Sequence, residues 1–272
     1  MKKSLLKKTA LLGTAVLASL GVAQAHRAWF LPSTFVLSGD EQWITVDAAV
    51  SNDLFYPNHR PMRSDGIIVT APDGSTVDIV NAVQGEIRTA FDVKLDQQGT
   101  YRIADGGIGY FAAWEEDGER QRKRGSFDEI IGGGYAEKPG AEITQSYRRI
   151  ETMVTLGAPS TDNLSMTGKG LELDPVSHPN DIVTGEPATF GFFRDGEPAA
   201  GIEVTIVRGD DRYRDKVDEQ KLTTDESGQV SFTMDAPGTY WLETEAEGEV
   251  TVEGITMTQR LSYVLTFEVL DL

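Results

Sequence analysis

The residues with the clearest chemical potential stand where a secretory signal would be cut. Residues 1–8 carry four lysines, residues 9–22 are apolar, and Ala23-Gln24-Ala25 is followed at once by His26. This three-part pattern is typical of a cleaved signal. Cleavage after Ala25 would make His26 the first mature residue, with a free α-amine beside its imidazole. Those two nitrogens can chelate one ion, and neutral imidazole suits copper, nickel, cobalt or zinc.

The alternative for residues 1–25 is a membrane anchor. The apolar run is shorter than the roughly 20 residues that a spanning helix needs, and a small-residue cut site ends it. We therefore expect a periplasmic protein whose mature chain is not inserted in a membrane.

Charge and cysteine content exclude several classes of function. The formal charge is −18, and removal of the four lysines of the signal would take it to −22. A surface this acidic repels nucleic acid and anionic lipid, and it also keeps an exported protein soluble. The chain has no cysteine, which excludes disulfides, thiolate metal sites and cysteine nucleophiles.

Short β-rich runs bounded by Gly, Pro, Asp and Asn predict an all-β fold built from two tandem Ig-like or transthyretin-like β-sandwich domains. Expected domains are a signal peptide (1–25), an N-terminal sandwich (26–158), a linker with a first-strand region (159–185) and a C-terminal sandwich (186–272). The expected strands are 43–50, 66–71, 89–95, 100–103, 150–156, 189–193, 202–207, 230–234, 239–244 and 261–270.

An internal repeat supports two similar halves. The pattern Phe91-x-Val93-x-Leu95 followed by Gly99-Thr100-Tyr101 recurs 139 residues later, ending in Gly238-Thr239-Tyr240. Alternating apolar residues, a glycine turn and a tyrosine at the start of the next strand are typical of a late hairpin in Ig-like sandwiches. We interpret both tyrosines as structural corner or core residues.

Residues 115–140 differ from the rest of the chain. Four basic side chains fall within Glu119 to Arg124, and Gly132-Gly133-Gly134 follows. We expect a long mobile insertion with a solvated basic face, and a short helix over 140–147.

His59 is the second candidate metal ligand. It lies in a polar and aromatic loop after the strand expected at 43–50. In an antiparallel sandwich the first strand starts at the end where the second finishes, so His26 and His59 should share one end of the domain. Asp53 in the same loop is a candidate oxygen ligand or, alternatively, a turn-forming aspartate. His178, between the domains, reaches the metal only if the second domain folds back, and otherwise belongs to the linker.

No serine-hydrolase elbow, phosphate-binding glycine loop or zinc-protease helix is present in the sequence. Arg208-Gly209-Asp210 matches a cell-adhesion tripeptide, but a turn after a strand explains it equally well. With three histidines and no cysteine, we expect a binding protein rather than an enzyme.

The mature chain resembles the DUF4198 proteins of Gram-negative bacteria, which are related to periplasmic components assigned to cobalt and nickel uptake. The resemblance rests on the segments 25–33, 50–55, 58–61, 170–173, 178–181 and 195–201. It implies a periplasmic location, a tandem β-sandwich and a metal-handling role. The start at His26 is also similar to the histidine brace of copper chaperones and copper monooxygenases.

Three hypotheses follow. The first is a periplasmic protein that binds copper, nickel or cobalt through His26, with His59 as the second nitrogen donor, and delivers the metal to an envelope uptake system. The second is a non-catalytic docking module of the cell envelope, for which the histidines are irrelevant. The third is a copper-dependent oxidase with a substrate face formed by Trp29, Phe30, Phe55 and Tyr56.

Overall fold

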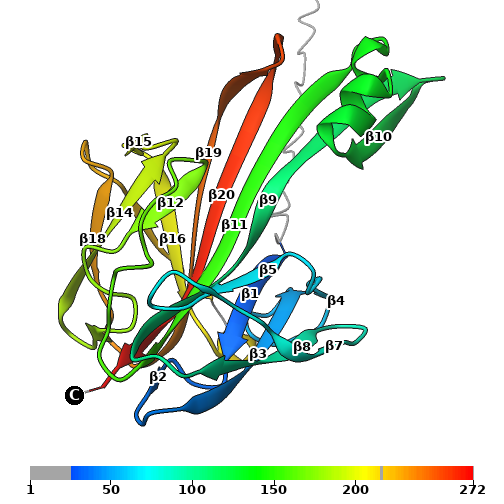
Figure 1. Cartoon of the computed structure of the whole chain (residues 1–272). Helices are drawn as coiled ribbons and strands as arrows, with labels where there is room; N and C mark the ends of the chain where they lie inside the picture. The colour runs from blue at the N-terminus through cyan, green and yellow to red at the C-terminus, as the bar shows by residue number, and fades with distance from the viewer. Residues whose placement is uncertain (1–25, 215–216, 272) are drawn as a thin grey trace, which may run out of the picture.

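The computed structural model describes residues 26–214 and 217–271, and the predicted signal segment 1–25 lies outside them. The regular secondary structure of the described chain is almost entirely β, which confirms the predicted fold class. It forms three sheets (Figure 1).

The N-terminal sheet has five strands in the order β1-β3-β8-β7, with β4 paired to β3. Strand β8 alternates apolar and polar residues, and every second side chain is buried. This is the period expected when one face packs on a core and the other meets solvent. The strands are β1 (Arg27–Pro32), β3 (Gln42–Ser51), β4 (Arg60–Pro61), β7 (Val80–Gln84) and β8 (Thr89–Leu95).

The central sheet has eleven strands and contains residues from both halves of the chain. Its main path is β17-β16-β19-β20-β11-β9-β5-β6, with β10 paired to β9, β13 to β20 and β2 to β11. The strands are β2 (Val36–Leu37), β5 (Ile67–Thr70), β6 (Thr76–Val77), β9 (Gly99–Glu116), β10 (Glu119–Gly125), β11 (Glu142–Leu156), β13 (Ile182–Val183), β16 (Glu203–Arg208), β17 (Gln220–Thr223), β19 (Gly238–Val252) and β20 (Ile255–Leu270).

The C-terminal sheet has four strands and packs against the other face of the central sheet. Three short helices complete the described chain. The strands are β12 (Leu171–Asp174), β14 (Pro187–Arg194), β15 (Glu197–Pro198) and β18 (Gln229–Thr233), and the helices are η1 (Asp128–Gly132), η2 (Tyr135–Glu137) and η3 (Asp211–Tyr213).

The two halves share the central sheet, in contrast to the separate sandwiches expected from the sequence. Strand β11 of the first half pairs in parallel with β20 of the second over nine positions, from Thr144↔Thr258 to Thr152↔Thr266. Both faces of β20 are buried here. Val264 lies in the core beneath the N-terminal sheet, and Leu265 lies in the core beneath the C-terminal sheet. Each sandwich therefore uses part of one common sheet as its inner layer.

The repeat detected in the sequence is a pair of equivalent crossings between sheets. Strand β8 leads from the N-terminal sheet into β9 of the central sheet, and β18 leads from the C-terminal sheet into β19. The turn glycines Gly99 and Gly238 have φ values of 125° and 133°, a region that favours glycine. The Tyr101 hydroxyl accepts hydrogen bonds from two backbone amides of its own turn, and the Tyr240 hydroxyl donates to the Ala236 carbonyl. The structural role predicted for both tyrosines is confirmed, although the connection joins two sheets rather than forming a hairpin.

Residues 115–140 and 140–147 differ from their predicted conformations. The predicted helix at 140–147 is wrong, because residues 142–147 begin β11 and pair with both β9 and β20. The predicted loop insertion instead forms the β9–β10 turn, β10 and the helices η1 and η2. Ile130 of η1 is fully buried with Trp114 and Met257 in a third apolar cluster, which fixes these helices on the sheet.

Candidate metal site at one end of the N-terminal sheet

The N-terminal sheet positions His26 and His59 on either side of the same strand end. Strand β3 ends at Ser51, which pairs with Arg27 at the start of β1, while Val50 pairs with Arg60 at the start of β4. His26 immediately precedes β1 and His59 immediately precedes β4. Antiparallel pairing therefore brings two residues separated by 33 positions in the sequence to one end of the sheet.

The two imidazole rings are in contact. Their centroids are 3.9 Å apart, with an angle of 25° between the ring planes, which is a stacked arrangement. Both side chains are exposed. Desolvation lowers the pKa of His59, and the nearby His26 and Arg60 lower it further. A lowered pKa favours the neutral imidazole, which is the form that binds metals.

The imidazole nitrogens at this end of the sheet fit a transition metal. In the stacked arrangement, however, the two rings are not oriented to chelate one ion. A metal binds in the plane of an imidazole at about 2.0–2.1 Å from the nitrogen. The lone pairs of two nearly parallel rings cannot meet at one such point, so one ring must turn about its side-chain torsions. Because both histidines face solvent, that turn displaces no core residue.

Asp53 forms part of the loop structure. Its carboxylate accepts a hydrogen bond of 2.7 Å from the side-chain amide of Asn58, whose own carbonyl oxygen accepts from the Asn52 backbone amide. The Asp53 carbonyl accepts from the Ser51 hydroxyl. These contacts are those of a turn-forming aspartate, which was the alternative interpretation of Asp53. Its role as an oxygen ligand stays a prediction.

A buried charge cluster from the second half of the chain secures this end of the sheet. The Asp211 carboxylate accepts hydrogen bonds from the Leu54 backbone amide at 3.0 and 3.1 Å, and it pairs with Arg27 at 3.2 Å. Arg27 also pairs with Glu219 at 2.7 Å and lies over the ring of Trp241. Asp211 could not be recognised from the sequence, because an aspartate after Arg208-Gly209-Asp210 gives no local sign of a contact 157 residues away.

The loop next to His59 contains a strained backbone and an aromatic cleft. Phe55 has a φ of 63°, unusual for a bulky residue, and packs edge-on against Trp29. A cleft of about 330 Å³ is lined by Phe55, Tyr56 and residues 208–210 and 238–239. The other two aromatics proposed for an oxidase face, Trp29 and Phe30, are fully buried in the core. Of the four, only Phe55 and Tyr56 line the cleft.

The structure does not bring His178 to the His26 site. Its Nδ1 accepts a hydrogen bond from the Asn180 amide, and its Nε2 lies 3.1 Å from both the Ser160 carbonyl and the Thr100 hydroxyl. Thr100 follows the corner after β8, at the opposite end of the N-terminal sheet from Ser51. Burial lowers the pKa of His178, which favours the neutral ring, and the hydrogen bonds of this ring hold the connection between the two halves.

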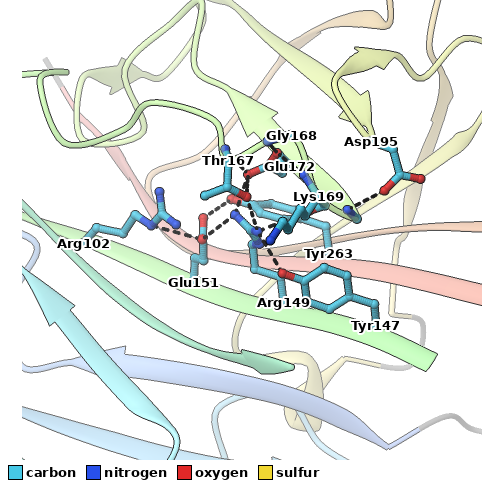
Figure 2. Close-up of polar contacts among 11 residues, drawn as sticks. Arg102, Tyr147, Arg149, Glu151, Thr167, Gly168, Lys169, Glu172, Asp195 and Tyr263 are labelled. Carbon is cyan, nitrogen blue, oxygen red and sulfur yellow. Dashed lines mark hydrogen bonds and ion pairs between the residues drawn. The ribbon is translucent and has the colours of Figure 1, made fainter. Parts of the chain in front are cut away.

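A buried polar network lies where that connection meets the central sheet (Figure 2). Glu172 accepts hydrogen bonds from the backbone amides of Thr167, Gly168 and Lys169, and pairs with Arg149 at 2.8 Å. Burial would raise the pKa of Glu172, but the hydrogen bonds and Arg149 outweigh it and lower the pKa. These contacts satisfy the carboxylate within the protein and fasten the loop before β12 to β11. The network is thus structural.

The described residues hold neither a preassembled metal site nor a membrane-spanning helix. Within 26–214 and 217–271, no group of three or more His, Asp or Glu side chains has the arrangement of a metal site. A chelate at His26 therefore depends on the α-amine that processing would release. In the same part of the chain, no helix is both long and apolar enough to cross a membrane.

Comparison with known proteins identifies a family but no activity. No curated protein matches the chain. Among solved structures, the D0-D1 domain of intimin is 13% identical over 86% of this chain and 96% of that one, with a TM-score of 0.21. Trypsin-activated alpha-2-macroglobulin from Escherichia coli is 12% identical over 89% of this chain but only 16% of that one, with a TM-score of 0.23. Scores this low support no functional argument. The family model described as a domain of unknown function, DUF4198, matches residues 23–248, and the chain belongs to this family.

Proposed function

We propose that the protein is a periplasmic binding protein that captures a transition-metal ion, copper, nickel or cobalt, at His26 and His59. The stacking of these two rings supports the proposal, because it places two exposed nitrogen donors together at one end of the sheet. Processing after Ala25 would add the α-amine as a third nitrogen. A set of nitrogen donors without thiolate favours Cu(II) or Ni(II), with affinity in the order Cu(II), Ni(II), Co(II).

Binding through these groups depends on pH. An α-amine has a reference pKa of about 7.7–8.0 and an imidazole about 6.5, and each must be unprotonated to bind. Affinity should therefore fall steeply below neutral pH. The lowered pKa of His59 extends its own binding range to lower pH, which leaves the α-amine as the group that limits binding first.

Titration with Cu(II) and Ni(II) tests the proposal, on protein shown by mass spectrometry to begin at His26. His26→Ala, and a variant with one additional residue before His26, should each lose affinity by more than roughly tenfold, a loss that even outer-shell partners of metal ligands can produce. His59→Ala should also lose affinity. Asp53→Asn tests the separate prediction that this carboxylate is a ligand, and His178→Ala, away from the His26 site, serves as the control. If both N-terminal variants bind as tightly as the unmodified protein, the proposal is wrong.

Delivery to an envelope uptake system extends this proposal. A metal ion bound at an exposed site at the end of a sheet can pass to a transporter by direct contact, whereas an ion enclosed in a core cannot. Metal transfer from the loaded protein to a purified transporter, compared with transfer through a dialysis membrane, separates contact-dependent delivery from simple release.

A second candidate function is a non-catalytic docking module, and one observation favours it. Strands β9, β10, β11, β19 and β20 continue beyond the outer sheets and expose strand edges there (Figure 1). A pull-down from envelope extracts in the presence of chelator tests this function without contribution from the metal site.

A further inference from the structure

The central sheet extends into an arm that the metal site does not use. We define the arm as residues 110–125, 142–146 and 245–262, with the helices η1 and η2 packed on one face. Its strand order is β10-β9-β11-β20-β19. The two outer strands of the arm are therefore β10 on one side and β19 on the other (Figure 1).

One edge of the arm is basic. Strand β10 pairs with β9 alone among the described strands, so its other side is open. Arg120, Arg122 and Arg124 alternate along it and so lie on one face of the sheet. Arg120 pairs with Glu142, and Arg124 lies over the ring of Phe111. Arg122 is exposed, and the described part of the chain gives it no ion pair.

The opposite edge is acidic. Strand β16 pairs with β19 only as far as Thr244, so β19 has no strand partner on this side from Glu245 to its end at Val252. The Glu247 carbonyl in this stretch accepts a hydrogen bond from the Arg194 side chain. Glu245, Glu247 and Glu249 alternate along this open part and are exposed. Glu247 pairs with Arg260 of the neighbouring strand. Within the described residues, Glu245 and Glu249 have no ion pair.

The two charged rows lie on the same face of the arm. Strand pairing connects Arg124 to Phe111, Phe111 to Thr144, Thr144 to Thr258 and Thr258 to Glu249, which is one continuous row across all five strands. Residues that are level in neighbouring strands point to the same face. The face carrying Arg124 and Glu249 is opposite to the face that η1 and η2 cover, since the apolar cluster uses the alternate positions.

Strand direction makes the two edges complementary. Strand β10 runs antiparallel to β9, and the pairings across the arm make β19 run parallel to β9. A second copy translated sideways therefore presents its β19 antiparallel to β10 of the first. In the level position, Arg124 of the first copy would lie opposite Glu249 of the second. A shift of the second copy by four residues along the strand, roughly 13 Å, places Arg120, Arg122 and Arg124 opposite Glu249, Glu247 and Glu245.

We propose that the arm is a self-association surface, on which the basic edge β10 of one copy pairs with the acidic edge β19 of a second copy and extends the sheet. The contact uses two different edges, so it leaves one edge of each kind free and forms open chains rather than closed dimers. This inference is independent of the metal proposal, because neither edge includes His26 or His59.

Charges on open strand edges commonly protect a protein against edge-to-edge association. Like charges on both edges would repel a second copy, whereas opposite charges on the two edges give no protection between copies. The formal charge of −18 does oppose association at long range. At physiological ionic strength, however, interactions are screened beyond about 8 Å, so the local pairs decide the outcome.

Sedimentation velocity of the full exported protein, over a wide range of concentration at physiological salt, tests the proposal. The basic-edge variant is Arg122→Glu with Arg124→Glu, and the acidic-edge variant is Glu245→Lys with Glu249→Lys. The wild type should gain mass with concentration, and each variant alone should lose that gain. An equimolar mixture of the two variants should regain it, because each then presents the charge that the other needs.

The control is Glu86→Lys with Glu186→Lys, two exposed glutamates outside the arm that change the net charge as the acidic-edge variant does. This control should associate like the wild type. Circular dichroism verifies that every variant is folded, and recovery in the mixture excludes misfolding as the cause of the loss. A wild type that remains monomeric throughout, or folded variants that associate unchanged, or a mixture that does not recover, overturns the proposal.

Discussion

Glu243 on β19 should make the protein less stable as the pH rises through neutral. Burial raises its pKa to about 7 from an ordinary value of 4.5, with Glu245 adding to the shift, Arg27 opposing it and Glu219 adding to it. Because the folded pKa lies above the unfolded one, the folded state holds the proton more tightly between these two values. The stability that this group contributes is present below pH 4.5 and is lost as the pH rises to about 7. A difference of this size corresponds to about 3 kcal/mol.

Replacement of Glu243 by Gln should therefore change the free energy of unfolding more favourably at pH 8 than at pH 4. The difference between the two changes should be up to about 3 kcal/mol. Urea unfolding of both proteins at the two pH values measures this difference. Glu86→Gln, at an exposed position that does not contribute to the Glu243 shift, changes the net charge equally and should show little pH-dependent gain. Unfolding curves of the wild type and Glu243→Gln that shift in parallel between pH 4 and pH 8 would refute the reasoning.

Four further predictions concern the contacts that join the two halves. Asp211→Ala should cost about 2–3 kcal/mol, because it leaves the buried Leu54 amide without an acceptor, and urea unfolding measures this loss. Residues 26–158 alone should not give the dispersed amide spectrum of a folded domain, since their core is completed by the second half. Glu172→Ala should cost about 3 kcal/mol by breaking a buried ion pair; because its folded pKa is lowered, this contribution should disappear as the pH falls below about 4. His178→Ala should lower the melting temperature while Cu(II) affinity in titration remains unchanged.

Much of the secondary structure could be predicted from local patterns. The strand predicted at 89–95 has those bounds in the structure, because its alternation of apolar and polar residues has the period of a half-buried strand. Six strands proved longer than predicted. In β19, for example, the run Glu245 to Glu249 lies in the exposed arm, where one face needs no apolar residues. The helix expected at 140–147 failed because pairing to two neighbouring strands overrides weak local preference.

The position of the candidate site followed from the sequence because it depends on a short-range connection. Strands β1 and β3 lie close together in the sequence, with only the two-residue strand β2 between them, and they pair antiparallel. The end at which His26 and the loop after Ser51 meet is therefore set by topology. The stacking of His26 on His59 agrees with that argument. The contribution of Asp211 could not be anticipated in this way, because no local pattern indicates which loop of the second half reaches Leu54.

The shared sheet changes how the candidate site should be understood. The sequence suggested that each half buries its own core, yet Trp241 and Val264 of the second half complete the core beneath β1 and β3. Trp241 also donates a hydrogen bond to the carbonyl of Ala28, two residues after His26. Parallel pairing between β11 and β20 has no signal in the sequence, since 114 residues separate the partners. The end of the sheet that carries the histidines is thus held in place by residues from the far end of the chain, and its geometry depends on the integrity of both halves.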